Sequence, residues 1–429
     1  MSGLSSRSFP RHLRSSLLLG ALVLAALPAA CSGADSSIGA GGEAPAGPPS
    51  EGDAAPPTAD GAVVQADGGT ATDGGTATDA SLDAALPACV TLHWTSVSVD
   101  KPVRLDYGGP SVAANGATLR VAIPDNLSQR LRVATRTAGG WQSGSVEAGT
   151  FPKQTSHVIG PAGQSLIALF DGIAVDGQRL VEGTTGAFGL SALTTVGSTQ
   201  SDAFYRGTNG QTLVMDSAES LHLLYVNAGN GLHHAVRPKA GTWTNTLVTD
   251  GVPEVWTGVA ADGLTLHAVY VNTYVSPQFL QVQYATKAPN AAWAIKPLTA
   301  GATEPHIAVD AAHGLHVSYV THATRDLVHA SRPLGGTWKF DTVDSAGDVG
   351  GRSRIAIDHA GAVHIVYEDG LNGLKEAVRA PGAVAWTITV IDAGGAKGDL
   401  FVAADDTMHV AYYHSAEAAV KWATRAPCR

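Results

Sequence analysis

Five histidines, each followed three residues later by a tyrosine, could together suggest a ring of metal ligands. They are His222 with Tyr225, His267 with Tyr270, His316 with Tyr319, His364 with Tyr367 and His409 with Tyr412. Imidazole binds many metals, but the ligands of one ion must lie within about 2 Å of it. Pairs that recur every 45 to 50 residues or so occupy equivalent places in separate structural units. We therefore predict that each histidine is hydrogen-bonded between strands, that each tyrosine packs between units, and that no metal or other cofactor is bound.

Arginines and aspartates repeat at a similar interval. Each set falls at one place in the repeat. The arginines are Arg136, Arg237, Arg332, Arg379 and Arg425, and the aspartates are Asp262, Asp310, Asp358 and Asp405. A residue that repeats with the unit serves the unit, whereas one site on a pseudo-symmetric ring needs different groups from each unit. Aspartate before a turn commonly bonds the backbone of that turn. We predict structural roles for both sets.

The elements that position these residues are short β-strands. With 50 Gly, 22 Pro and 15% charged residues, the chain has the composition of a loop-rich β protein. One unit reads "PHIAVD", "LHVSYV", "LVHASR" and "TWKFDTV", four strands between residues 305 and 343. A tryptophan opens the fourth strand of most units, and the spacing of roughly 48 residues is typical of propeller blades. These tryptophans are Trp94, Trp141, Trp243, Trp293, Trp338 and Trp386.

We predict an all-β fold, a seven-bladed β-propeller of four-stranded blades. The folded part begins with a tryptophan strand, "TLHWTSVSV", and ends with a third-type strand, "VKWATRAP". The N-terminal strand would complete the last blade, a Velcro closure that removes open sheet edges. Six or eight blades are alternatives, because residues 142–210 match the repeat poorly. Cys89 and Cys428 flank these two strands, and we predict a disulfide between them, which suits an exported protein.

The N-terminal residues predict export. Residues 1–30 combine arginines with the apolar run "SLLLGALVLAALP", which is too short to span a bilayer and is typical of a signal peptide. The following "LPAAC" resembles the lipobox of bacterial lipoproteins, which implies a lipid on Cys31. Ordinary cleavage that leaves a free thiol is the alternative. Residues 31–88 are rich in Ala, Gly, Ser, Thr and Asp and predict a disordered tether before the propeller of residues 89–429.

The charge distribution argues against one class of partner. The chain has a net charge of −10, but nine of its acidic residues lie in the tether, so the folded part is nearly neutral. Such a domain has no electrostatic footprint for nucleic acid.

The expected setting is the cell envelope, with a lipid anchor in the outer membrane or at the cell surface, and we expect a monomer.

The turn "SRPLGGTW" resembles the Asp-box of BNR-repeat, sialidase-like propellers, which reads Ser-x-Asp-x-Gly-x-Thr-Trp. Ser331, Gly335, Thr337 and Trp338 match this pattern, and Pro333 stands where the family has its aspartate. The resemblance implies a propeller fold over about residues 91–429. It also implies sugar chemistry by an arginine cluster, a tyrosine nucleophile with a glutamate, and an aspartate acid. No such catalytic set is recognised in this sequence.

Residues that break the repeat are the better site candidates. On a propeller, the loops from fourth to first strands and from second to third strands share one face around the channel. Aromatic and charged side chains there suit recognition of a sugar or peptide, because rings stack and polar groups fix orientation. The candidate ligand-binding residues are Tyr107, Tyr205, Arg206, Trp256, Tyr274, His306, Arg352, Arg354, Glu368 and Asp369.

The regular repeats favour a surface-tethered lipoprotein whose propeller is a binding module for glycan or protein ligands. Two alternatives remain: a sialidase-like glycoside hydrolase or lyase, and an envelope-assembly scaffold. A convergent cluster of non-repeated charged residues at the channel mouth would favour an enzyme. An exposed hydrophobic rim would favour a scaffold.

Overall fold

The computed structural model describes residues 93–427, except for 117, 146–151, 172–177, 184–191, 198–211, 228–230, 251–252 and 273–279. The predicted signal peptide, the tether, Cys31 and the Cys89–Cys428 disulfide lie outside these residues. Over the described ranges the regular secondary structure is strand, and no helix there is long and apolar enough to be a membrane span. The all-β propeller class is confirmed.

The described strands form seven four-stranded sheets, and neighbouring strands in each are antiparallel. The first fourteen strands are β1 (Thr95–Asp100), β2 (Ser111–Asn115), β3 (Thr118–Asp125), β4 (Arg130–Thr137), β5 (Gly140–Ser145), β6 (Pro152–Ile159), β7 (Ser165–Asp171), β8 (Gln178–Gly183), β9 (Ala192–Gly197), β10 (Leu213–Met215), β11 (Leu221–Asn227), β12 (Gly231–Arg237), β13 (Thr244–Thr249) and β14 (Pro253–Asp262). The others are β15 (Thr265–Asn272), β16 (Gln281–Lys287), β17 (Ala294–Ala300), β18 (Ala302–Val309), β19 (Leu315–Thr321), β20 (Leu327–Arg332), β21 (Lys339–Asp344), β22 (Val349–Ile357), β23 (Val363–Asp369), β24 (Gly373–Arg379), β25 (Thr387–Asp392), β26 (Gly395–Val402), β27 (Met408–His414) and β28 (Ala419–Arg425).

One sheet joins the two ends of the folded region. Its strand order is β1-β28-β27-β26, whereas each of the other six described sheets consists of four consecutive strands. Val97 of β1 lies opposite Trp422 of β28, and Thr95 lies opposite Thr424. Strand β1 therefore occupies the outermost position, which the fourth strand takes in the other sheets.

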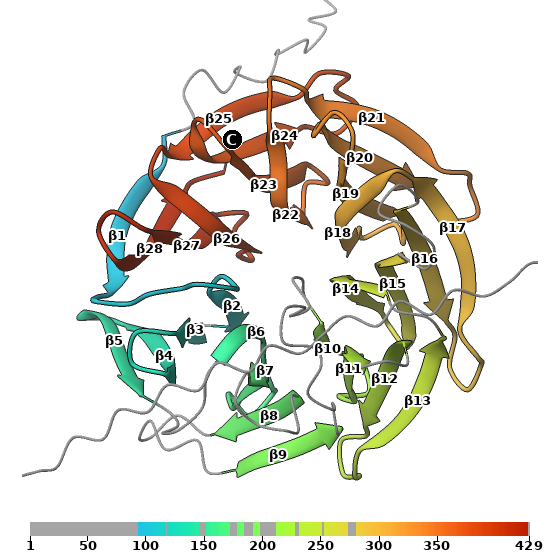
Figure 1. Cartoon of the computed structure of the whole chain (residues 1–429), viewed down its shortest axis with the longest axis horizontal. Coiled ribbons are helices and arrows are strands. Elements are labelled where there is room, and N and C mark those ends of the chain that lie inside the picture. Colours follow the sequence, from blue (N-terminus) through green and yellow to red (C-terminus); the bar gives the residue numbers. More distant parts are fainter. Residues whose placement is uncertain are drawn as a thin grey trace, which may run out of the picture. The chain divides into compact units, whose positions relative to one another are not determined.

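The first strands of the sheets surround a central channel. Figure 1 shows β2, β6, β10, β14, β18, β22 and β26 nearest the centre, with the later strands of each sheet farther out. Residues from all seven of these inner strands line one channel of about 500 Å³. The inner strands are therefore the elements that can bring unlike side chains from different sheets together.

Packing between sheets explains the apolar runs of the second and third strands. In the sheet of β18–β21, strands β19 and β20 are mostly buried, whereas half of the residues of β21 are exposed. Val317 and Tyr319 of β19 share a hydrophobic cluster with Val269 and Tyr284 of the preceding sheet. Strands covered on both faces need apolar residues at successive positions, whereas an outer strand does not. All five repeated tyrosines pack in clusters that span two sheets, as predicted.

The repeated arginines and tryptophans form one structural unit. An arginine of the third strand lies over the tryptophan that opens the fourth, with Arg379 4.5 Å from the ring centre of Trp386 and Arg332 5.0 Å from that of Trp338. The same contact joins Arg425 of β28 to Trp94 at 5.4 Å. Cation–π contacts of this kind stabilise by about 0.5 to 2 kcal/mol each. The structural role predicted for these arginines is therefore confirmed at these positions.

Most of the repeated histidines form side-chain hydrogen bonds to the neighbouring strand of their sheet. His316 Nδ1 lies 3.1 Å from His329 Nε2, and His364 Nδ1 lies 3.0 Å from Glu376 Oε1. His222 and His267 have equivalent bonds, whereas His409 stacks on Trp422 instead. No group of three or more side chains that could hold a metal occurs in the described part of the chain.

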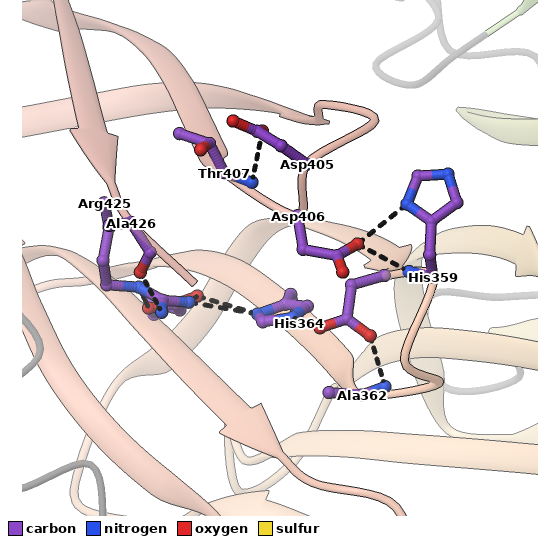
Figure 2. Close-up of polar contacts among 10 residues, drawn as sticks. His359, Ala362, His364, Asp405, Asp406, Thr407, Arg425 and Ala426 are labelled. Carbon is purple, nitrogen blue, oxygen red and sulfur yellow. Dashed lines mark hydrogen bonds and ion pairs between the residues drawn. The ribbon is translucent and has the colours of Figure 1, made fainter. Parts of the chain in front are cut away.

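The turn aspartates hold both their own turns and the histidines. Asp358 Oδ1 accepts the Ala362 N–H at 2.6 Å, and its Oδ2 lies 3.2 Å from His364 Nε2. The neighbouring turns are joined by His359, whose backbone N–H and Nδ1 both contact Asp406 Oδ1 (Figure 2). Asp310 and Asp405 also accept bonds from their own turns, as predicted, whereas Asp262 contacts His313 of the next sheet.

Candidate functional site at the channel mouth

Five inner strands shift register near their start, and three of them, β18, β22 and β26, share one kind of β-bulge. The pairing of β18, β22 and β26 with their neighbours shifts register near the start of each strand. In each bulge one residue has a left-handed backbone: Glu304 with φ 56°, Arg352 with φ 50° and Lys397 with φ 56°. Such values are uncommon for non-glycine residues, and bulges of this kind re-aim side chains. The bulges therefore set where these three long charged side chains point.

The bulges correct one expectation from the sequence. Trp256, His306, Arg352 and Arg354 were expected on loops that precede the first strands, but they lie within β14, β18 and β22. The extra residues of each bulge let the strand continue pairing to the mouth of the channel. Rigid strands, rather than loops, therefore position these side chains.

A pocket of about 180 Å³ lies where the inner strands begin. It is lined by residues before and in β2, and in β6, β14, β22 and β26. The lining consists of Gly109, Pro110, Ser111, Val112, Gln154, Thr155, Ser156, His157, Trp256, Arg352, Arg354, Lys397, Gly398, Asp399, Leu400 and Phe401. The lining carries three cationic side chains and one carboxylate, in a chain with a net charge of −10. The pocket is therefore locally basic.

Carboxylates of the preceding sheets hold two of the bulges. Glu304 Oε2 accepts the backbone N–H of Arg352 at 2.5 Å, and Glu368 Oε1 accepts that of Lys397 at 2.6 Å. Burial raises the pKa of Glu304, although the bond from Arg352 and the charge of Arg325 act in the opposite direction. Each carboxylate thus binds the backbone of a bulge residue, and Glu368 Oε1 also lies 3.9 Å from Arg352 Nη1.

Arg354 and Asp399 form a pair between β22 and β26. Arg354 Nε lies 3.4 Å from Asp399 Oδ1, and Arg354 Nη1 donates to Ser353 O at 3.1 Å. Asp399 Oδ2 accepts the backbone N–H of Val112 at 2.8 Å, which ties β26 to β2. Burial lowers the pKa of Arg354 and raises that of Asp399. The pair thus links three inner strands at the pocket.

Lys397 is the second basic bulge residue in the lining. Its Nζ donates to the backbone oxygen of Leu105. Burial, together with the positive charge of Arg352, lowers the pKa of Lys397 to about 8. A substantial fraction of this amine is therefore neutral near pH 8.

Two buried histidines face the channel. His306 is 4% exposed and lines the channel, and its Nδ1 accepts the backbone N–H of Ile355 at 3.3 Å. His157 is also 4% exposed and lines both the pocket and the channel. Burial, with the charge of Arg120, lowers the pKa of His157 to about 3, and burial with Arg354 lowers that of His306 strongly. Both rings are neutral at physiological pH.

The structure brings four of the predicted candidates to the mouth or channel. Trp256, Arg352 and Arg354 line the pocket, and His306 lines the channel below it. Trp256 is partly buried and also packs against the hydrophobic cluster between two sheets. Trp256 therefore combines a position at the mouth with packing between two sheets.

Other candidates have different placements. Glu368 supports the Lys397 bulge, and Tyr107 is 43% exposed with Lys153 Nζ 5.0 Å from its ring centre. Asp369 accepts the Leu371 N–H of its own turn, and its Oδ2 forms an ion pair with Lys375 Nζ at 2.5 Å. Tyr205, Arg206 and Tyr274 lie outside the described residues.

Several lining residues were missed from the sequence, among them Gln154, His157, Lys397 and Asp399. The sequence does carry a signal for Lys397. Lys397, Glu304 and Arg352 each precede a repeated histidine by 12 residues, so they occupy one structural position of the repeat with unlike charges. Variation in charge at a fixed place in the repeat is the mark of a site that breaks the symmetry of the fold.

Comparisons with known proteins identify the fold. No family model and no curated protein matches the chain. An ulvan lyase of a new polysaccharide lyase family, bound to -[GlcA(1-4)Rha3S]-, is 11% identical over 76% of this chain and 95% of its own, with a TM-score of 0.54. The polysaccharide lyase Uly1 is 9% identical over 76% and 91% of the two chains, with a TM-score of 0.51. A six-bladed fucose-recognising lectin of Aleuria aurantia is 16% identical over 69% and 98%, with a TM-score of 0.43. The protein is thus similar in fold to these two polysaccharide lyases.

Proposed function

We propose that the protein is a carbohydrate-binding propeller whose binding site is the pocket at the channel mouth. The observation that supports this most directly is the pocket lining, in which Trp256 lies with Arg352, Arg354 and Lys397 around one small hollow. An aromatic ring can stack on the apolar face of a sugar, while convergent polar groups fix its orientation. Lectins and polysaccharide lyases of similar fold are compatible with such a ligand.

A glycan array probed with the full chain tests this proposal, followed by Trp256→Ala. We expect the variant to lose about 1 to 3 kcal/mol of binding free energy, as for an aromatic anchor. It should also lose less stability than the roughly 3 to 5 kcal/mol expected for a fully buried tryptophan, because Trp256 is only partly buried.

Trp386→Ala is the matched control, since Trp386 belongs to the structural series and donates to Asp341 at 2.7 Å. This variant should lose stability and keep its glycan affinity. If no glycan binds, or if the two variants weaken binding equally, the proposed site is wrong.

A second candidate function is polysaccharide lysis, and Lys397 is the residue that favours it. A neutral amine in the pocket could take the proton from C5 of a uronate while the C4–O bond breaks. A C4–C5 double bond would form, and the departing sugar oxygen would take a proton from solvent. Incubation with acidic polysaccharides should then raise the ultraviolet absorbance of the unsaturated product. If the absorbance stays unchanged with every polysaccharide that binds, the lyase proposal is wrong and the binding proposal stands.

The closure of the propeller and the attachment of the protein to the cell envelope are further parts of this proposal. We propose that the seven sheets are the blades of one ring that β1 closes, and that a Cys89–Cys428 disulfide reinforces this closure. We also propose export, with a lipid on Cys31 that tethers the domain to the envelope. Peptide mapping without reduction tests the disulfide, and Cys31→Ser should release the protein from the membrane fraction.

The scaffold alternative has less support. Large apolar side chains are exposed at separate places, such as Val97 in β1, Leu334 between β20 and β21, and Leu371 between β23 and β24. Apolar residues scattered singly over a surface are normal and do not define an interface.

A further inference from the structure

We propose that the inner part of this site binds an anionic group of the glycan, a carboxylate or a sulfate ester, through Arg354 and the N–H groups of His306 and His157. This inference rests on the proposed carbohydrate binding and adds the chemical class of the ligand. It follows from which hydrogen-bonding groups at the site already have partners and which do not.

The tautomer of His306 is fixed by its contact with the backbone. Its Nδ1 lies 3.3 Å from the Ile355 nitrogen, and a backbone N–H can only donate, so Nδ1 is the acceptor. Because the ring is neutral, its one proton is on Nε2. Nε2 is buried and has no hydrogen-bond partner among the described residues. His306 therefore presents an unused donor in the channel lining.

His157 has a similar arrangement. Ser165 Oγ accepts from Arg120 Nη1 at 2.9 Å and lies 3.1 Å from His157 Nε2, so we assign its hydroxyl proton to the bond with that nitrogen. The single proton of this neutral ring is then on Nδ1. The backbone of Ser111 opposes the lowering of the pKa of His157, yet Nδ1 forms no hydrogen bond of normal geometry within the described residues. A second buried donor thus lies where the pocket and the channel meet.

Arg354 supplies the charge. A guanidinium has five N–H donors, and the contacts to Asp399 and Ser353 involve only Nε and Nη1. The neighbouring carboxylate is already occupied, because one oxygen of Asp399 faces Arg354 and the other accepts from Val112. Arg352 and Lys397 add two more positive charges to the lining.

The balance of groups selects an anion over a neutral sugar. The unused groups are mainly donors, and carboxylates and sulfates offer only acceptors in this setting. One buried acceptor, Gln154 Oε1, also lacks a partner within the described residues and suits a ring hydroxyl of the same ligand. Because both histidine rings are neutral at physiological pH, recognition through their donor N–H groups does not require protonation.

The experiment compares three probes with one ring: galactose, galacturonate and galactose-6-sulfate. Each is titrated into the full chain at constant ionic strength, and the arms distinguish a carboxylate from a sulfate. We expect one charged sugar to bind at least about tenfold more tightly than galactose, as hydrogen bonds to charged groups allow. Arg354→Gln should abolish this preference, and His306→Phe should reduce it.

Lys339→Gln is the matched control, because it removes one positive charge at an exposed position of the outer strand β21. It should leave the preference unchanged. If Arg354→Gln does not fold, Arg352→Gln replaces it, since this variant keeps the backbone N–H that Glu304 accepts. The assignment is overturned if the preference for the charged sugar is unchanged in the arginine variant and in His306→Phe. It is also overturned if Lys339→Gln reduces that preference as much as these pocket variants do.

Equal affinity for charged and neutral sugars also overturns the anionic site, but it leaves carbohydrate binding intact. Absence of binding to every glycan of the array contradicts the proposed function itself. The two failures are therefore distinguishable.

Discussion

Single residues in this propeller act mainly as links in polar chains between strands. In the sheet of β18–β21, Asp310 contacts His316, His316 contacts His329, and His329 Nδ1 lies 3.1 Å from Asp341 Oδ1. Asp341 Oδ2 also accepts from Trp386 at 2.7 Å and from Arg379 at 2.9 Å. One carboxylate thus ties the third strand of its own sheet to the arginine–tryptophan pair of the next.

This carboxylate predicts a pH dependence of stability. Partial burial would raise the pKa of Asp341, but hydrogen bonds from His329 and Trp386 and the charge of Arg379 lower it to about 2. A pKa below the unfolded value means that the stabilisation is complete above about pH 4 and is lost as the pH falls towards 2. Asp341→Asn should therefore be less stable than wild type at pH 7, with the difference shrinking between pH 4 and 2.

Urea unfolding at several pH values measures this difference. Asp348→Asn is a suitable control, because Asp348 is mostly exposed in its ion pair with Arg325. A constant difference between wild type and Asp341→Asn over the whole pH range would contradict the linkage.

At the scale of elements, the sequence predicted the strands well and the bulges poorly. The tryptophans, the alternating apolar runs and the turn aspartates repeat because every sheet has the same packing, so periodicity locates the strands. A bulge leaves no comparable signal, since Glu304, Arg352 and Lys397 adopt a backbone conformation that sequence rules assign to glycine. Shifts of register decide which side chains face the channel, so the site residues were found only in part.

Contacts between neighbouring sheets can be tested at Arg425. Its guanidinium, 3% exposed, donates from β28 to Glu376 of β24 at 2.6 and 3.0 Å, and the carboxylate is fully buried. Removal of one partner leaves a buried charge, so Arg425→Met should cost about 3 to 5 kcal/mol of unfolding free energy. The double variant Arg425→Met/Glu376→Gln should recover a large part of this loss.

The exposed pair Lys239–Glu219, at 2.6 Å, gives the comparison. Lys239→Met should cost less than about 1 kcal/mol, because surface ion pairs contribute little. A similar loss for Lys239→Met and Arg425→Met, or no recovery in the double variant, would show that the buried charge is not the source of the effect.

At the scale of the whole molecule, the pairing of β1 with β28 makes stability depend on both ends of the folded region. Val99, Val103 and Leu105 pack with Val420 and Trp422 in one hydrophobic cluster. Without β1, strand β28 would present an open, apolar edge to solvent, which invites aggregation. The chain that begins at Lys101 should therefore melt at a clearly lower temperature and aggregate more than the chain that begins at Ser81. Addition of a peptide of residues 89–100 should restore part of the stability, since it can pair with the free edge of β28, whereas a scrambled peptide should not. Equal melting temperatures of the two chains, or equal rescue by both peptides, would mean that β1 does not close the fold.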